Sequence, residues 1–585
     1  MATPLDPGPS QPRRPRAFAG LLAALALALL WTPGVSEAHA WGWDESVHAE
    51  LPAVHMLTSA TMGDVGGVAD AILGCHQYPF AYPVVLAASQ GIFGVSETVA
   101  RRTGRVVWAL ALFGLFLLVR EALSAVERAR GSPLRGARAA PWLALVGGAA
   151  SPLGMSLSGM LFLEVPFACA ATFTLWWWIR RTTFEGTARL RAELLAGAWV
   201  TLCFFTKFNY GLLLALGLGL DVACDFVPAF RRGHANEFAK RLAVTSLVPV
   251  LALLWWFVLP LPGDFEVAAT HREKFVGFIL GNTDVASIPW HRRVLGWTTR
   301  LVVSPRAMLL FGAGIAATLL LATTRGTRTL WLVALAFVVP TTMHNFYQDR
   351  FLLPASLSLF ALASIGWARM LPRSPAVGTA VAALVAVLVS FAPTWDGELL
   401  AARMGLLPET DTPEIAAYKR EVLARSSDLR PWRPLTTGGL LREELDGFLD
   451  LAAEEVGSDE CPGWIGISSE LAPGAFFTGL VERGWSRASF HAYADDEPGE
   501  RYITMQGADP QWSEERLTTF LEPHDVLFYT EPIDVKNRRG RAFMESYRDR
   551  VLARGWQARE LGSVDIARPL REPLSVRLFA ARPPE

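Results

Sequence analysis

The sequence carries an adjacent pair of carboxylic acids, Asp44 and Glu45, a few residues after its first long apolar run. Trp41 and Trp43 flank the start of this pair, and tryptophan favours the membrane–water boundary. A carboxylate placed there can act as a general base that takes the proton of an attacking hydroxyl. Asp44 is the candidate for this role, with Glu45 as the second member of the pair. A solvated loop beside a membrane span is the ordinary alternative.

Basic side chains stand where several apolar segments begin or end, and such cations can bind a phosphate as negative charge develops on it. Lys207 interrupts an apolar stretch, and Arg350 opens a late one. Four further candidates lie in one long polar segment: His271, Arg272, Arg292 and Arg293. For Lys207 the alternative is a side chain that reaches to the membrane surface, and for Arg292 and Arg293 it is contact with lipid headgroups.

Two histidines follow the acidic pair at helical spacing. Asp44, His48 and His55 would share one face of a helix, and with Glu45 or Glu50 their imidazole and carboxylate groups suit zinc or manganese. A polar helix face packed against another domain is the favoured explanation. We therefore assign no metal and no certain cofactor, and keep His48 and His55 as weak candidates for a divalent metal site.

The composition of the chain indicates what kind of protein holds these residues. The chain has 585 residues, of which 51% are hydrophobic and 19% charged, and its mean hydropathy is +0.28. These values lie between those typical of a soluble enzyme and those of a pure bundle of membrane helices. They therefore predict one membrane domain and one soluble domain. The formal net charge of −1 gives no concentrated basic surface, which argues against nucleic acid as a partner.

Apolar runs predict about eleven membrane-spanning helices in a polytopic α-helical protein. They lie near 17–32, 106–119, 141–157, 165–179, 192–206, 209–226, 242–260, 307–323, 329–343, 351–368 and 376–393. Basic residues fill the short loops between them on one side, which predicts that side to be cytoplasmic. The apolar run at 79–93 is too short to span and is interpreted as an interfacial helix. A multi-pass protein of the plasma (inner) membrane follows, with its N-terminus inside.

This topology divides the chain into three parts. Residues 1–16 are a disordered cytoplasmic lead, 17–394 are a membrane domain with outer loops at 41–104 and 262–305, and 395–585 are an outer domain. Ala38-His39-Ala40 has the form of a signal-peptidase site, so a cleaved signal is the alternative to a retained first span. Cys75 and Cys461 both fall on the outer side, and the sequence leaves open whether they form a disulfide.

The outer domain is expected to be a small soluble α/β unit. Trp464–Ser468, Val526–Thr530 and Leu574–Ala581 are short apolar runs typical of buried strands. Segments 473–484, 518–521 and 540–554 are interpreted as helical or connecting. Charged residues become frequent after Trp395, and the sequence predicts no further span beyond 394.

Several short motifs occur in a consistent order along the membrane domain. They are Asp44-Glu45, Tyr78-Pro79-Phe80-Ala81-Tyr82, Phe93-Gly94-Val95-Ser96-Glu97 before Arg101-Arg102, Leu163-Glu164-Val165-Pro166, Thr206-Lys207-Phe208 and Asp349-Arg350-Phe351-Leu352-Leu353-Pro354. In these motifs the chain resembles C-type glycosyltransferases of the protein O-mannosyltransferase and lipid A aminoarabinose transferase kind, over about residues 17–370. It departs from the family where Tyr78-Pro79-Phe80 replaces Pro-Pro-Leu and Phe351 replaces tyrosine.

The resemblance implies that a sugar passes, with inversion, from a polyprenyl-phosphate carrier to an acceptor protein, lipid or glycan on the outer face. Asp44 would be the base. The donor phosphate or lipid would bind to the basic residues named above. The substrate path would include Tyr78, Pro79, Tyr82, Arg101 and Glu164. Membrane lipids are the remaining expected partner.

Two other functional classes are weighed against this one. A transporter or flippase of a lipid-linked sugar would show symmetry between halves and ionisable residues near the middle of the bilayer. The sequence has no internal repeat, and its charges gather at the outer boundaries. A non-catalytic membrane scaffold with an outer binding domain would leave the acidic pair at 44 and 45 unexplained.

Overall fold

The fold is taken from a computed structural model, which describes residues 14–30, 49–75, 78–134, 136–280, 290, 294, 305–321, 324–343, 349–370, 442–455, 457, 460–465, 473–483, 502–503, 514–522, 524–532, 538–566 and 574–584. Four expectations lie outside these residues: the lead at 1–13, the Ala38-His39-Ala40 motif, the span at 376–393 and the domain boundary at 394/395.

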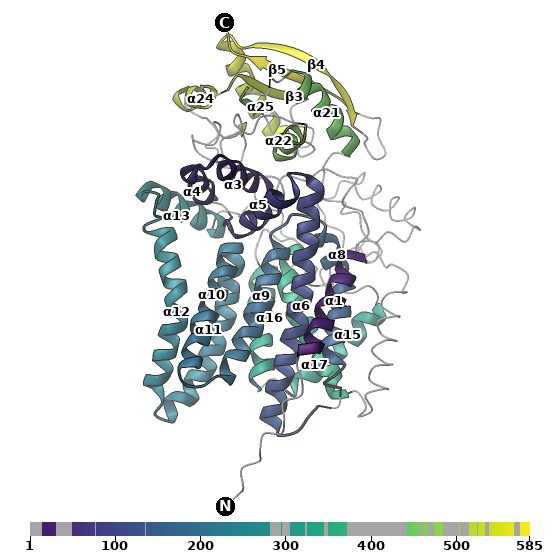
Figure 1. The fold of residues 1–585 in the computed structure, drawn as a ribbon, viewed down its shortest axis with the longest axis vertical. Helices are drawn as coiled ribbons and strands as arrows, with labels where there is room; N and C mark the ends of the chain where they lie inside the picture. Colours follow the sequence, from purple (N-terminus) through teal and green to yellow (C-terminus); the bar gives the residue numbers. More distant parts are fainter. Residues whose placement is uncertain are drawn as a thin grey trace, which may run out of the picture.

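A bundle of upright helices occupies one end of the molecule and a small sheet the other (Figure 1). The bundle consists of α1 (Arg14–Leu30), α6 (Glu97–Arg130), α7 (Ala140–Ala149), α8 (Pro152–Ser158), α9 (Glu164–Arg180), η3 (Arg181–Thr183), α10 (Gly186–Thr206), α11 (Phe208–Arg231), α12 (Ala235–Phe257), α15 (Pro305–Leu319), α16 (Arg325–Met343), η4 (Asp349–Leu352) and α17 (Leu353–Met370). Between the bundle and the sheet lie α3 (Leu51–Met62), α4 (Val65–Leu73), α5 (Ala81–Phe93) and α13 (Phe265–Leu280).

The longest helix, α6, runs through the whole bundle and reaches the sheet domain. Its first turn is capped by Ser96, whose Oγ accepts a hydrogen bond from the backbone N–H of Val99 at 3.2 Å. It ends at Gly131, which adopts a left-handed φ of 66°. At 34 residues it is roughly 50 Å long, which exceeds the hydrocarbon thickness of a bilayer. A helix of this length can extend past a bilayer at its ends.

Five helices among the described residues are long and apolar enough to cross a membrane. They are Glu97–Arg130, Phe208–Arg231, Ala235–Phe257, Arg325–Met343 and Arg350–Met370. The polytopic helical architecture is thus confirmed, whereas the count of about eleven spans is not. Several expected spans are shorter helices: α1 and α9 have 17 residues each, α15 has 15, and the run at 141–157 is divided between α7 and α8.

The core of the bundle forms where α6, α7, α9, α16 and α17 pack together. Leu112, Phe167 and Phe337 are fully buried in this core. The helix α1 packs onto α6, where Ala24 and Ala28 are buried and Gly20 faces Phe116 so closely that a Cβ would lie 2.8 Å from its ring. The first apolar run is therefore an integral part of the fold.

The sheet domain contains α21 (Arg442–Glu455), α22 (Pro473–Glu482), α24 (Glu514–Leu521) and α25 (Arg538–Ala553) with five strands. The strands are β1 (Pro462–Ile465), β2 (Tyr502–Ile503), β3 (Val526–Glu531), β4 (Gln557–Ile566) and β5 (Leu574–Arg582). Their order is β2-β1-β3-β5-β4, with β1 parallel to β2 and β3 and with β5 antiparallel to β3 and β4. The expected α/β domain is confirmed, and β2, β4 and α21 are additions to the predicted elements.

Two smaller expectations concern the apolar run at 79–93 and the pair formed by Cys75 and Cys461. The apolar run at 79–93 becomes α5, which packs against α3 and α6 beside the sheet domain. Cys75 and Cys461 do not form a disulfide, because the thiol of Cys75 instead donates a hydrogen bond to the carbonyl oxygen of Ala71 at 3.3 Å.

Candidate active site

A buried ion pair lies at the end of the bundle that faces the sheet domain. The Nζ of Lys207 donates to Oε1 of Glu164 at 2.7 Å, and the exposed fractions of the two side chains are 5% and 1%. The Oη of Tyr210 donates to the same carboxylate oxygen at 3.3 Å. A buried carboxylate with two donors is well compensated, so this pair persists where an isolated charge would not.

Local backbone geometry explains why Lys207 points into the bundle. The helix α10 ends at Thr206 and α11 begins at Phe208, so Lys207 alone forms the connection, with extended φ and ψ of −160° and 110°. The close return of the chain needs a glycine at position 211, where a Cβ would lie 2.5 Å from the Cα of Phe204. Glu164 occupies the first turn of α9, where the helix dipole favours a negative charge.

Arg350 joins the pair from a third element. It lies in η4, immediately before α17, and its Nε is 3.7 Å from Oε1 of Glu164. Its side chain is 16% exposed, which is three times the exposure of Lys207. Two cations from different elements therefore lie beside one carboxylate. Arg350 is the cation with more access to a ligand.

Aromatic rings enclose both cations. The Lys207 ammonium lies 4.3 Å from the ring centroid of Tyr210, and 5.3 Å from the rings of Tyr78 and Phe351. The Arg350 guanidinium stacks over Phe162 at 4.1 Å. Such contacts are worth more when desolvated, as these are. The predicted residues Tyr78, Glu164, Lys207 and Arg350 thus meet in one cluster.

Tyr82 and Arg101 lie beside this cluster rather than within it. Arg101 pairs with Glu97 at 2.6 Å and donates to the carbonyl of Gly159 at 2.8 Å. Tyr82 is buried, and a Cβ placed on Gly104 would be 3.5 Å from its Oη. Arg101 therefore anchors the chain between α8 and α9, the segment that leads into Glu164. Pro79 lies two residues before the first residue of α5, next to Tyr78.

The long segment after α12 packs at the same end of the bundle as the Glu164–Lys207 pair. Both ring nitrogens of His271 are engaged by backbone carbonyl oxygens, Nδ1 with Trp256 at 2.9 Å and Nε2 with Leu73 at 2.7 Å. Its ring stacks on Trp256 with centroids 3.9 Å apart, and burial lowers its pKa. Arg272 donates to the carbonyl of Phe257. The structure does not bring either residue to Glu164; Arg292 and Arg293 lie outside the described residues.

The acidic pair Asp44-Glu45 and His48 also lie outside the described residues. His55 is buried within α3. Over the part of the chain that is described, no three His, Cys, Asp or Glu side chains gather as a metal site would require.

Comparisons with known proteins bear on the fold. A crystal structure of ArnT from Cupriavidus metallidurans in the apo state aligns over 97% of this chain and 98% of that chain, with a TM-score of 0.52 and 16% sequence identity. A structure of the same ArnT bound to undecaprenyl phosphate aligns over 96% and 98%, with a TM-score of 0.53 and 16% identity. This chain has the fold of ArnT. No protein-family model and no curated protein matches the sequence.

Within this ArnT fold, sequence reasoning missed two members of the cluster, and it named Glu50 only as a possible metal ligand without predicting its burial. Tyr210 follows Lys207 by three residues, a spacing that places both on one side of a helical turn and could have indicated it. Phe162 carries no comparable signal. Glu50 is completely buried, and Nε2 of Gln90 donates to its Oε1 at 2.6 Å. Burial raises the pKa of Glu50 to about 8, against this hydrogen bond, which lowers it.

The residue types of the cluster suit the binding of an anion. Two cations held in place by one carboxylate, with aromatic walls that exclude water, form a preorganised positive site. The carboxylate of Glu164 accepts hydrogen bonds from Lys207 and Tyr210, and the Nε of Arg350 lies 3.7 Å from it.

Proposed function

We propose that this chain is an integral-membrane glycosyltransferase that moves a sugar from a polyprenyl-phosphate carrier to an acceptor. The observation that carries the proposal is the buried Glu164–Lys207–Arg350 cluster, set in an ArnT fold that extends over almost the whole chain. One ArnT structure holds undecaprenyl phosphate, and a polyprenyl phosphate presents the kind of anion that this cluster suits.

Lys207 and Arg350 bind the carrier phosphate in this proposal. Glu164 pairs with both cations and holds them in the same place. Arg350 is the more exposed cation and presents a planar fork that matches phosphate oxygens. Lys207 contributes a compact ammonium group that acts as a point charge. Their stabilisation grows as the sugar leaves, because the phosphate gains a full negative charge at that step.

Asp44 acts as the general base, with Glu45 beside it. The leaving group is already a stable phosphate anion, so no second carboxylic acid is needed to protonate it, unlike in glycosidases. Asp44 takes the hydroxyl proton of the acceptor while the hydroxyl oxygen attacks the anomeric carbon from the face opposite the phosphate. The configuration at that carbon is therefore inverted.

The aromatic residues around the cluster define the substrate path. Tyr78 precedes α5 and Tyr82 lies in its first turn, and Phe80 between them packs on Phe205 at 5.2 Å between ring centroids. This apolar wall suits the first isoprene units of a carrier whose phosphate lies at Lys207. Pro79 sets the entry to α5, and Arg101 holds the segment before Glu164.

The membrane placement follows from the same proposal. The sheet domain lies at one end of the bundle, next to the start of α9 that carries Glu164 (Figure 1). The helices α6, α9, α11 and α17 have basic residues in their last turns, at the other end. With basic ends in the cytoplasm, the cluster and residues 395–585 face outward from the plasma membrane. The acceptor, whether protein, lipid or glycan, then meets the donor on the outer face.

Turnover by the purified full chain in detergent tests the proposal. Undecaprenyl-phosphate mannose and undecaprenyl-phosphate aminoarabinose serve as donors, with a cell-envelope extract as the source of acceptor. We expect release of undecaprenyl phosphate from one of the donors, and loss of that release in Asp44→Asn. The matched control is Asp70→Asn, an exposed carboxylate on α4 in the same outer segment. Full turnover in Asp44→Asn, or movement of the intact lipid-linked sugar across vesicles without release, would contradict it.

A further inference from the structure

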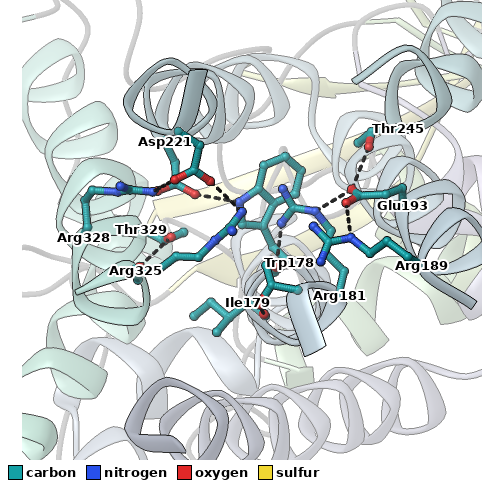
Figure 2. Close-up of polar contacts among 12 residues, drawn as sticks. Trp178, Ile179, Arg181, Arg189, Glu193, Asp221, Thr245, Arg325, Arg328 and Thr329 are labelled. Carbon is teal, nitrogen blue, oxygen red and sulfur yellow. Dashed lines mark hydrogen bonds and ion pairs between the residues drawn. The ribbon is translucent and has the colours of Figure 1, made fainter. Parts of the chain in front are cut away.

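A second polar cluster lies at the opposite end of the bundle, where α9, α10, α11, α12 and α16 meet. Figure 2 shows its two carboxylate centres, Glu193 and Asp221, on either side of Trp178. Glu193 accepts from Arg181 at 2.6 Å and from Arg189 at 2.7 Å. Asp221 accepts from the indole nitrogen of Trp178 at 3.0 Å. The proposed transferase reaction uses none of these groups.

The Asp221 centre continues into the start of α16. Arg328 pairs with Asp221 at 2.8 Å and with Asp225 at 2.6 Å, and Arg325 pairs with Asp225 at 2.8 Å. These contacts tie α11 to α16, and the Glu193 contacts tie α9 to α10. Between them opens a cavity of about 430 Å³, lined by side chains from both centres. Cavities of this size hold small ligands or the headgroup of a larger one.

The cavity carries more positive than negative charge. Six guanidinium groups line it, those of Arg181, Arg189, Arg232, Arg241, Arg325 and Arg328. They are matched by four carboxylates, of which Glu193, Asp225 and Glu237 line the cavity and Asp221 pairs with Arg328. Two positive charges are left over. An anion that enters the cavity therefore meets an unbalanced field in a partly desolvated site.

Two arginines have hydrogen-bonding capacity to spare. The buried Nε of Arg325 has no hydrogen-bond partner among the described residues. Arg232, in the turn after α11, is exposed and makes no ion pair within the part of the chain that the structure describes. Buried donors are normally satisfied, so an unpartnered N–H in a side chain that lines a cavity indicates a ligand or ordered water beside that side chain. Both donors are cationic, which favours a phosphate oxygen as the acceptor.

The surroundings of the cavity distinguish a lipid from a dissolved ion. Leu242 and Phe238 of α12 line the cavity, and Leu242 is 41% exposed. Next to them on α11, Phe226 is 42% and Phe230 64% exposed, and Phe226 packs on Phe238 at 5.5 Å. Apolar side chains exposed on two candidate membrane helices would face acyl chains. A ligand with a phosphate head and apolar tails satisfies both surfaces at once.

We propose that this cavity, lined by Arg232, Arg325 and their neighbours, binds the phosphodiester headgroup of an anionic phospholipid. The headgroup lies between the guanidinium groups of Arg232 and Arg325, and the acyl chains lie along the exposed apolar faces of α11 and α12. Basic pockets between helices at the cytoplasmic surface bind anionic lipids in this way. The lipid joins α11, α12 and α16 at the end of the bundle remote from Lys207.

Lipid retention by the full chain tests the assignment. The protein is reconstituted in nanodiscs of phosphatidylcholine and phosphatidylglycerol, and the lipids that stay bound are counted by native mass spectrometry. We expect preferential retention of phosphatidylglycerol, and a loss of affinity of about fivefold in Arg232→Gln, since each cation near an anionic lipid contributes about that factor. Arg325→Gln should act in the same direction, with Arg328 still paired to Asp225.

The control is Arg130→Gln, which removes an exposed arginine at the last residue of α6, outside the cavity. It should leave lipid retention unchanged. Because Arg232 is exposed, its variant should fold normally, and the melting temperature checks this. Equal retention of the two lipids, or an equal loss in Arg130→Gln, would overturn the proposal. Stabilisation by inorganic phosphate without retention of phosphatidylglycerol would overturn it as well, because the ligand would then be a dissolved anion.

Discussion

At the scale of single residues, Glu164 decides how the two cations of the candidate active site behave. Its carboxylate is 1% exposed and lies within reach of Lys207, Tyr210 and Arg350. Desolvating a lysine and an arginine without a counter-ion is costly, so the carboxylate is what allows both to remain in the bundle. Glu164 is in this sense a positioning residue, whereas Lys207 and Arg350 contact the proposed ligand.

Replacement of this carboxylate should destabilise the protein. In Glu164→Gln the buried Lys207 loses the carboxylate with which it pairs at 2.7 Å, and breaking a buried pair in this way costs about 3 to 5 kcal/mol. The melting temperature of the purified full chain in detergent should fall clearly. Glu237→Gln is the control, since Glu237 is 61% exposed in a surface pair with Arg241 and should change stability by less than about 1 kcal/mol. Identical melting of Glu164→Gln and the parent chain would contradict the assignment.

Glu50 should make stability depend on pH. Burial raises its pKa to about 8, so the carboxyl is neutral in the folded protein near neutral pH but ionised in the unfolded chain. The contribution of this proton to the free energy of unfolding is fully present below the ordinary glutamic pKa of about 4.3. It is lost as the pH rises through about 8. The parent chain should therefore lose more melting temperature between about pH 6 and about pH 9 than Glu50→Gln does. Parallel pH profiles for the two proteins would rule this out.

At the scale of elements, the junction between α10 and α11 positions the site. Lys207 is a one-residue connection, and the helices on either side approach closely because residue 211 has no side chain. The cation is thus held by the packing of two helices rather than by a loop. Any change that separates these helices should move Lys207 relative to Glu164.

Two glycine-to-alanine substitutions on α11 distinguish the effect of close helix packing from the effect of intrinsic helix propensity. Gly211→Ala places a Cβ 2.5 Å from the Cα of Phe204, whereas Gly219→Ala meets nothing within 4 Å. We expect Gly211→Ala to lower stability and donor affinity, because backbone atoms must shift. Gly219→Ala should be neutral or stabilising by up to about 1 kcal/mol. Thermal melting and binding of undecaprenyl phosphate measure both effects; equal behaviour of the two variants would contradict the close-packed junction.

Apolar runs predicted the positions of the membrane helices but not their ends. The run at 106–119 lies inside α6, which begins at Glu97 and ends at Arg130 because polar residues at both ends continue the helix beyond the membrane. The edge strand β4 was missed, since most of its side chains are exposed and give no buried pattern. The helix α21 had a usable signal: Leu445, Phe448, Leu449 and Ala452 follow helical spacing and are all buried.

The sequence could single out candidate site residues, whose roles stay predictions, but it could not predict which of them meet. Lys207 and Arg350 are conspicuous because each interrupts or opens an apolar segment. Lys207 and Glu164 are 43 residues apart, and their contact depends on how α9, α10 and η4 pack. Residue type and position indicate chemistry, but only tertiary packing determines which charges share one carboxylate.

At the scale of the whole molecule, one arginine links the sheet domain to the bundle. Arg442 of α21 pairs with Glu97 of α6 at 2.8 Å and with Glu482 of α22 at 2.8 Å. The backbone N–H of Glu97 donates to Glu482 at 2.9 Å. Glu97 also pairs with Arg101, so the domain contact is continuous with the segment that leads to Glu164.

Loss of this link should loosen both partners. In Arg442→Gln we expect faster hydrogen exchange in α22 and in the first turns of α6, because the two carboxylates lose their shared cation. Arg483→Gln is the matched control, since Arg483 pairs with Asp446 and Asp450 inside the sheet domain only. Exchange mass spectrometry of the full chain measures the difference. A change confined to α22 would show that the domain is held to the bundle by other contacts.

The central claim is that the Glu164–Lys207–Arg350 cluster binds the carrier phosphate. Equilibrium binding of undecaprenyl phosphate to the purified full chain tests it most directly, with Lys207→Met and Arg350→Gln compared to Lys274→Met, an exposed lysine of α13 at the same end of the bundle. The account predicts that each cluster variant binds about tenfold or more weakly, the loss expected for a hydrogen bond to a charged group, while Lys274→Met binds as the parent chain does. Undiminished binding by both cluster variants would contradict it.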